Sequence, residues 1–92
     1  MILSFRTPET EELFVSGQSR RFASITLVAT RKLRQLDSAL QLKDIASPPG
    51  NRLEALHGER SGQYSIRVND RYRICFRWTE VGPREVEIVD YH

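Results

Sequence analysis

The sequence is poor in residues that cross-link small folds or hold metal ions. It has one cysteine, Cys75, and two histidines, His57 and His92. One cysteine cannot close a disulfide within the chain, and these residues together are too few for the usual structural zinc site. We therefore expect no disulfide, no metal and no cofactor, and a fold that depends on its hydrophobic core.

Long hydrophobic runs and a secretory leader are also missing from the sequence. No stretch approaches the roughly 18 apolar residues that a membrane span needs. The opening residues, MILSFRTPETEE, do not place an apolar run after a basic one. We therefore expect a cytoplasmic protein with no membrane partner. Several enzyme classes also lose support, because the sequence contains no glycine-rich phosphate loop, HExxH, GxSxG or CxxC motif.

Length and composition fit one small globular domain. The chain has 92 residues, of which 39% are hydrophobic and 28% are charged. These proportions are ordinary for a folded protein, and a compact domain usually has about 100–150 residues. We predict a single domain over residues 1–92, in which the turn-rich segment 47–51 is an ordered loop.

Positive charge comes mainly from arginine and is unevenly distributed. Arginine accounts for twelve of the fourteen basic residues, and the formal net charge is +2. Residues 52–77 carry six arginines and three acidic residues, whereas residues 78–92 carry one arginine and four acidic residues. Because the planar guanidinium group matches phosphate well, the first segment is a candidate contact for a polyanion.

The first half of the sequence predicts a short strand and two helices. Residues 2–5 have strand character, Thr7-Pro8 favours a helix start, and Ser16-Gly17 favours its end. A second helix is expected over residues 19–40, where apolar residues recur at steps of three and four. Its apolar stripe is Phe22, Ile25, Ala29, Leu33, Leu36 and Leu40. Its other face, solvated by default but open to an anionic partner, carries Arg20, Arg21, Arg31, Lys32 and Arg34.

Beyond residue 51 the hydrophobic period changes to two, which predicts strands. The inward rows are Tyr64, Ile66 and Val68, then Tyr72, Ile74, Phe76 and Trp78, then Val86 and Ile88. Turns are expected at residues 69–71 and 81–83. If residues 53–56 also pair, the strands form a twisted antiparallel sheet with its apolar face on the helices. The predicted fold class is therefore α+β, with the N-terminal strand and the helices on one face of the sheet.

The opposite face of the predicted sheet carries Arg67, Arg73 and Arg77. Taken singly, each arginine is explained as a polar residue that keeps an exposed sheet face soluble. The period of two also places Arg73 and Tyr91 on the same face, on strands expected to be neighbours. A guanidinium and a phenol together suit a phosphate and a stacked base. Cys75 lies between Arg73 and Arg77, and we interpret it as a small filler residue.

The C-terminal residues Asp90, Tyr91 and His92 place a carboxylate, a phenol and an imidazole in succession. Metal-free RNA cleavage needs a base for the 2′-OH proton, an acid for the 5′-oxygen, and cations for the phosphate charge. These residues with Arg73 supply all three, although a terminal histidine alone is more often incidental. His57 either reaches the same face or only caps a loop, and both readings stay open.

Two runs of sequence resemble one family of toxins. They are residues 62–78, GQYSIRVNDRYRICFRW, and residues 86–92, VEIVDYH. The similarity continues upstream through the predicted long helix and residues 47–54, SPPGNRLE, and covers nearly the whole chain. The pattern resembles the HigB-type toxins, close to the HigB/GraT branch of the RelE superfamily. This resemblance implies a compact α+β toxin of a type II toxin–antitoxin pair that cuts messenger RNA in the ribosomal A site.

The resemblance also implies roles for residues and partners. Arg73 would bind the scissile phosphate, His92 with Asp90 would transfer protons, and Tyr91 would position or stack on a base. Arg67, Arg77 and the basic residues of the long helix would contact RNA of the message and the ribosome. The implied partners are the ribosome, messenger RNA and a helix-turn-helix antitoxin of the HigA type. Operator DNA would be reached only through that antitoxin.

The chain departs from this family just before the hairpin. Relatives can carry a histidine and a lysine there, whereas this sequence reads Glu54-Ala55-Leu56-His57. An acidic residue in place of a basic one would weaken phosphate binding, and His57 is a candidate substitute. Three function classes therefore remain, in this order: a ribosome-dependent endoribonuclease, a non-catalytic inhibitor that binds the ribosome or RNA, and a co-repressor subunit of an antitoxin complex.

Overall fold

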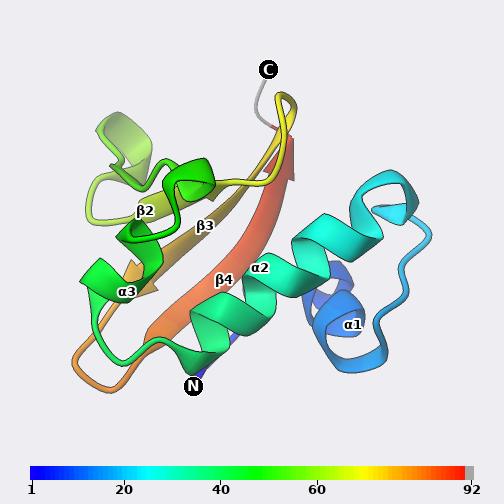
Figure 1. The fold of residues 1–92 in the computed structure, drawn as a ribbon, viewed down its shortest axis with the longest axis horizontal. Helices are drawn as coiled ribbons and strands as arrows, with labels where there is room; N and C mark the ends of the chain where they lie inside the picture. The colour runs from blue at the N-terminus through cyan, green and yellow to red at the C-terminus, as the bar shows by residue number, and fades with distance from the viewer. Residues whose placement is uncertain (91–92) are drawn as a thin grey trace.

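The computed structural model describes residues 1–90, which form helices packed on a four-stranded antiparallel sheet (Figure 1). The α-helices are α1 (Pro8–Ser16), α2 (Thr26–Ser38) and α3 (Leu42–Ala46). Short 3₁₀ helices are η1 (Ala23–Ile25), η2 (Pro49–Asn51) and η3 (Gly58–Arg60). The strands, in spatial order, are β1 (Glu54–Ala55), β2 (Tyr64–Arg67), β3 (Tyr72–Trp78) and β4 (Pro83–Asp90). The predicted α+β class is confirmed.

Helix α1 begins and ends at the residues that the sequence predicts. Pro8 occupies the first turn, where its missing N–H costs nothing, and Glu9 and Glu11 favour the positive end of the helix dipole. Gly17 takes a left-handed conformation with φ of 73° and donates its N–H to the Leu13 carbonyl at 2.8 Å. These signals are local, and this explains why sequence alone locates them.

The predicted helix over residues 19–40 is wrong at both ends. Helix α2 begins only at Thr26, after η1, and ends at Ser38, because Ala39 is extended with ψ of 132°. The Asp44 carboxylate then accepts the N–H groups of Leu40 and Gln41 at 3.0 and 2.9 Å. This cap starts α3 and leaves Leu40 84% exposed, so Leu40 is not a core residue.

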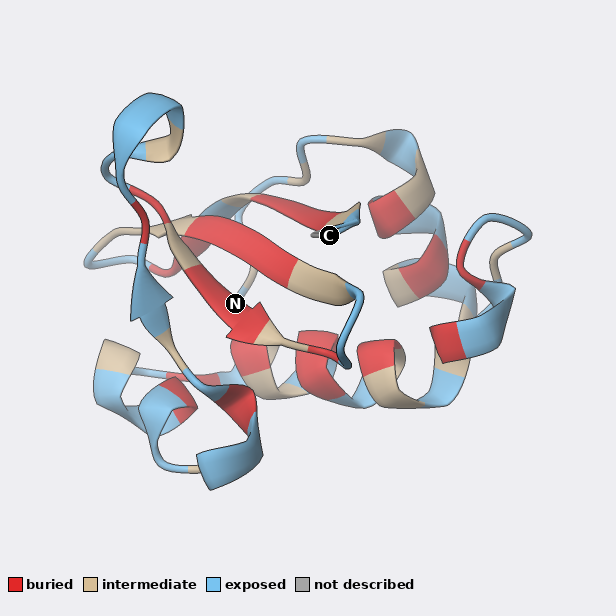
Figure 2. Cartoon of the chain, turned by 90° about the horizontal axis from the view of Figure 1, so that it is seen from above, coloured by how far each residue is buried: buried red, intermediate tan, exposed pale blue. Residues whose placement is uncertain are grey.

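The hydrophobic core lies between α2 and the sheet. Ile66 of β2 pairs with Ile74 of β3, which pairs with Ile88 of β4, so one row of isoleucines crosses the sheet. The predicted helix stripe faces this row with buried Phe22, Ile25, Ala29, Leu33 and Leu36. Figure 2 shows the buried residues on the strands and on the helix turns that face them, and exposed residues on the outer loops. The inward rows are confirmed at their centres, whereas Tyr64, Tyr72 and Trp78 are only partly buried.

The N-terminal segment lies along β4 but is not a full strand. Phe5 forms one parallel bridge with Val86, and Val86 donates its N–H to the Ser4 carbonyl at 3.1 Å. Further along β4, the Ile88 N–H bonds to Thr10 Oγ1 of α1 at 3.1 Å. The segment and α1 thus satisfy backbone groups that an open sheet edge would expose. Across residues 1–90, no helix combines the length and apolar character needed to cross a membrane.

We expect the contact between the N-terminus and the β3–β4 turn to exclude a side chain at Gly82. Gly82 has φ of 149°, and a Cβ atom there would lie 2.4 Å from the Met1 carbonyl oxygen. Gly82→Ala should lower the free energy of unfolding by about 1–3 kcal/mol, measured by urea denaturation. The matched control is Gly50→Ala, because a Cβ atom at Gly50 would meet no atom within 4 Å. Equal stability of the two variants would contradict this account.

Candidate functional site

Arg73 lies in β3 on the sheet face that points away from the helices. Its side chain is 11% exposed and its guanidinium is held from two sides. Nε donates to Ser65 Oγ on β2 at 2.7 Å, and Nη2 donates to the Arg52 carbonyl at 2.8 Å. Nη2 also lies 3.9 Å from Glu54 Oε2 of β1. The structure therefore fixes one cation on this face in a defined orientation.

Glu54 bears directly on the departure from the family pattern. This acidic residue, at a position where the resemblance implies a basic one, forms the ion pair with Arg73 and is itself exposed. Glu54 partly neutralises the guanidinium of Arg73 near the start of β3. Ser65 and the Arg52 carbonyl, by contrast, orient Arg73 without changing its charge.

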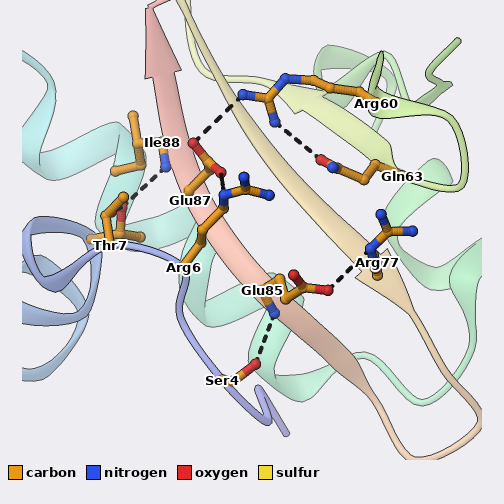
Figure 3. A network of polar contacts seen from close by, with 10 residues as sticks. Ser4, Arg6, Thr7, Arg60, Gln63, Arg77, Glu85, Glu87 and Ile88 are labelled. Carbon is orange, nitrogen blue, oxygen red and sulfur yellow. Dashed lines mark hydrogen bonds and ion pairs between the residues drawn. The ribbon is translucent and has the colours of Figure 1, made fainter. Parts of the chain in front are cut away.

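Arg67 and Arg77, the other two arginines predicted on this face, both contact carboxylates. Arg67 binds Asp70 at the tip of the β2–β3 hairpin. Arg77 Nε lies 3.0 Å from Glu85 Oε2, as Figure 3 shows. Glu85 is placed there by a bulge: β4 carries one extra residue between its pairs with Cys75 and Arg77, and Glu85 has φ of 53°. A phosphate that binds either arginine must compete with its carboxylate.

A second ionic cluster covers the middle of the same face. Glu87 Oε2 lies 3.0 Å from Arg6 Nε, and Glu87 Oε1 lies 3.6 Å from Arg60 Nη2 (Figure 3). Arg60 also donates to Gln63 Oε1 at 3.1 Å. Cys75 pairs with Glu87 across the strands and is fully buried. Burial raises the pKa of the Cys75 thiol, so it stays protonated and is a poor nucleophile, as expected of a filler residue.

Asp90 lies beside Arg71 at the end of β4. Its Oδ2 accepts from Arg71 Nε at 2.9 Å and from Arg71 Nη2 at 2.8 Å, and these bonds raise the pKa of Arg71. In the β3–β4 register Asp90 pairs with Tyr72, whereas Arg73 pairs with Val89. Because successive strand residues point to opposite faces, Asp90 and Arg73 start from opposite faces of the sheet. The predicted site residues Tyr91 and His92 lie outside the described residues.

His57 is exposed in the loop between β1 and β2, immediately before η3. The backbone of this loop is anchored next to it, where the Leu56 N–H bonds to the Gln63 carbonyl at 2.8 Å. The imidazole is therefore accessible from solvent, on the connection that leads from β1 into β2. Both readings of His57, as a site residue and as a loop residue, remain predictions.

The basic residues assigned to the long helix divide into three groups. Arg31 and Arg34 are exposed on α2, as predicted. Arg20 and Arg21 are exposed but precede η1, so they do not continue the face of α2. Lys32 is buried, and its prediction as a surface residue is wrong. The reason is its place on α2 beside Leu33, on the side that packs against the rest of the fold.

Lys32 is held by two backbone carbonyls. Its Nζ donates to the Arg67 carbonyl at 2.5 Å and to the Gly50 carbonyl at 3.4 Å. Burial lowers the pKa of Lys32, and the nearby charges of Arg31, Arg67 and Arg73 lower it further. No pattern in the sequence indicates this role, because a lysine next to an apolar stripe is equally typical of the edge of a solvated helix face.

Metal ligands are not grouped in the described part of the chain. Within residues 1–90, no three His, Cys, Asp or Glu side chains are close enough together to hold a metal ion. The groups that this region does bring together are guanidinium, hydroxyl and carbonyl around Arg73, flanked by arginine–carboxylate pairs. Such an arrangement can bind an anion and stabilise negative charge on it.

Two sequence comparisons indicate the same family of toxins. The model of a family described as the RelE-like toxin of type II toxin–antitoxin system HigB matches residues 3–92. Toxin HigB-1 of Vibrio cholerae serotype O1 is 39% identical over 82 residues, which cover 87% of this chain and 86% of that protein.

Two known structures from Staphylococcus aureus share the fold. A chain of the YoeB–YefM complex has a TM-score of 0.58 at 19% identity, over 100% of this chain and 98% of that chain. The YoeB dimer has a TM-score of 0.57 at 20% identity, over 99% of this chain and 94% of that chain. At such low identity, these likenesses show the arrangement of helices and sheet and nothing finer.

Proposed function

Since the chain belongs to the HigB-like family of RelE-like toxins of type II toxin–antitoxin systems, we propose that it is a ribosome-dependent endoribonuclease. Its substrate would be messenger RNA in the ribosomal A site, and cleavage would inhibit translation. The observation that supports this proposal most is the guanidinium of Arg73, oriented by Ser65 and the Arg52 carbonyl on the sheet face opposite the helices. An oriented cation is what a phosphate under attack requires.

The proposed reaction needs only groups that this sequence contains. The 2′-oxygen of the message bonds to the adjacent phosphorus, and the bond from phosphorus to the 5′-oxygen breaks. The products are a 2′,3′-cyclic phosphate and a 5′-hydroxyl. A base takes the 2′-OH proton, an acid protonates the 5′-oxygen, and Arg73 stabilises the charge that develops on the phosphate oxygens. We assign proton transfer to His92 with Asp90, and base positioning to Tyr91. Because Asp90 starts from the sheet face opposite Arg73, these groups would act from the end of β4.

An antitoxin is the partner that membership of a toxin–antitoxin family implies. We propose that it is a helix-turn-helix protein of the HigA type, and that the pair reaches operator DNA through the antitoxin alone. The ribosome, as part of the substrate, would be the second partner, which places the protein in the cytoplasm.

The arginines at the helix side are the proposed contact with ribosomal RNA. Arg31 and Arg34 are exposed, and within residues 1–90 no carboxylate forms an ion pair with either. The sheet-side Arg67 and Arg77, by contrast, are both paired with carboxylates. An arginine without a carboxylate partner can bind an RNA phosphate without first breaking an ion pair.

We therefore expect the double variant Arg31→Ala/Arg34→Ala to bind ribosomes more weakly, with a smaller dependence on salt. The slope of log affinity against log salt concentration should fall in magnitude by about 2, because roughly one released counterion is lost per arginine. Ribosome binding at several KCl concentrations measures this slope. Arg84→Ala is the matched control, because Arg84 is exposed but lies 3.7 Å from Glu85. An unchanged slope in the double variant would remove these residues from the interface.

The proposed function is tested by primer extension on a defined message incubated with the purified protein, with and without 70S ribosomes. We expect cuts within A-site codons only when ribosomes are present. Ribosome binding without any cut would favour the non-catalytic inhibitor, a reading that the pairing of Arg73 with Glu54 supports. Equal cleavage of free RNA would show an endoribonuclease that does not depend on the ribosome.

A further inference from the structure

Lys32 stands apart from the other basic residues of α2 because its charge points into the fold. Lys32 is only 7% exposed, whereas Arg31 and Arg34 on the same helix lie on the surface. A buried ammonium group needs hydrogen-bond acceptors, and it finds them in the carbonyls of Gly50 and Arg67. The Gly50 carbonyl belongs to the loop that ends at Arg52, whose carbonyl bonds to Arg73. The Arg67 carbonyl belongs to β2, where Arg67 pairs with Arg73.

The first acceptor belongs to the loop formed by η2 and Arg52, residues 49–52. Helix α2 holds this loop twice, because Lys32 bonds to the Gly50 carbonyl and Gln35 Oε1 accepts from Asn51 Nδ2 at 3.3 Å. Asn51 is itself buried, and its Nδ2 also donates to the Ile45 carbonyl at 3.0 Å. The loop is therefore attached to α2 and α3 rather than left to solvent.

The loop ends at the residue that contacts Arg73. Arg52 has φ of 45° and ψ of 59°, a left-handed conformation that is unfavourable for a residue with a Cβ atom. In this conformation its carbonyl accepts from Arg73 Nη2 at 2.8 Å. The direction of that carbonyl depends on how firmly residues 49–51 are held, since an unrestrained chain would leave the left-handed region.

The second acceptor connects Lys32 to the strand beside Arg73. Arg67, whose carbonyl accepts from Lys32 at 2.5 Å, pairs directly with Arg73 in the β2–β3 register. One ammonium group therefore bonds both to the neighbouring strand and to the loop that presents the Arg52 carbonyl. We propose that Lys32 is a positioning residue, which fixes the guanidinium of Arg73 relative to the scissile phosphate through residues 49–52.

This inference rests on the proposed function, so its test includes a readout that does not require cleavage. Lys32→Met keeps most of the length of the side chain and removes the donor. We expect the NMR signal of the Arg73 Nε–H group, identified by its loss in Arg73→Lys, to broaden or exchange faster with solvent in Lys32→Met. Lys43→Met is the matched control, because Lys43 is an exposed lysine on the neighbouring helix α3. A signal unchanged in Lys32→Met would overturn the inference even if the protein cleaves RNA.

Cleavage on ribosomes gives the second readout. Lys32→Met should lower kcat about 10- to 100-fold, the effect of a misplaced catalytic group, and leave KM unchanged. Lys32→Arg, which keeps a charged donor, should recover part of this loss. In the Arg73→Ala background Lys32→Met should have no further effect on kcat, because the group that it positions is gone. The same loss of kcat in both backgrounds would show a general structural effect and contradict the inference. Absence of cleavage by the wild-type protein would instead contradict the proposed function.

Discussion

Replacement of His92 by glutamine is expected to lower the rate of message cleavage on ribosomes by about 10²- to 10⁴-fold, the usual contribution of a general acid or base. Glutamine is similar in size and forms hydrogen bonds, but it does not transfer a proton near neutral pH. Binding to ribosomes should therefore be retained. The rate is measured by single-turnover cleavage of a message on purified 70S ribosomes.

His57→Gln is the matched control for this result. The chain has only these two histidines, and His57 lies exposed before η3. Full activity of His57→Gln with loss in His92→Gln would assign proton transfer to the C-terminal histidine and leave His57 as a loop residue. The reverse pattern would transfer the role to His57. Unchanged cleavage in His92→Gln would remove His92 from the mechanism.

Arg73→Ala is expected to lower the single-turnover cleavage rate by about 10²- to 10³-fold, as the loss of a charge-stabilising donor does in other enzymes. The physical reason is the fixed position of the guanidinium between Ser65 and the Arg52 carbonyl. Arg73→Lys should recover little of the rate, because one ammonium group does not reproduce the planar fork that bonds to both.

The Arg73 variants need a check of folding, because the side chain is only 11% exposed and makes several hydrogen bonds. Circular dichroism and urea denaturation should show a folded protein at the assay temperature. Arg84→Ala, at the exposed start of β4, should cleave at the wild-type rate. An Arg73→Ala protein that is folded and fully active would exclude Arg73 from the site.

The alternation of residues in the second half of the sequence was enough to predict the sheet. The row Ile66, Ile74 and Ile88 is buried, and Arg67 pairs with Arg73 as the hairpin turn requires. These features follow from a period of two and a turn of fixed length, and both are local properties of the chain. The same arithmetic indicated that Arg73 faces away from the helices.

The errors in the helical half have a common cause. The apolar stripe, with steps of three and four, continues through Leu40, but α2 ends before it, where the Asp44 carboxylate caps the start of α3. The periodicity of apolar residues does not show that this cap outweighs continuation of the helix. The charge of Lys32 predicts a position in solvent. Its actual environment depends on the distant carbonyls of Gly50 and Arg67, which only the tertiary fold brings to it.

The ion pairs of the sheet face could not be predicted either. Glu85 reaches Arg77 only because a bulge shifts the register of β4 by one residue. Glu87 meets Arg60 from the β1–β2 connection and Arg6 from the N-terminal segment, which are far apart in the sequence. These contacts matter for the proposed function, since RNA would have to compete with carboxylates for Arg67 and Arg77, two of the arginines expected to bind RNA.

In the proposed function, Arg73 on the outer sheet face stabilises the charge of the phosphate, and Arg31 and Arg34 on the helix side bind the ribosome. The most direct test is the single-turnover cleavage rate as a function of ribosome concentration for Arg73→Ala and for Arg31→Ala/Arg34→Ala. We predict that Arg73→Ala lowers the maximal rate at saturating ribosomes with little change in the half-saturating concentration. The double variant should raise the half-saturating concentration and keep the maximal rate. The opposite pattern, or loss of the maximal rate in both, would contradict the division of roles between the two faces.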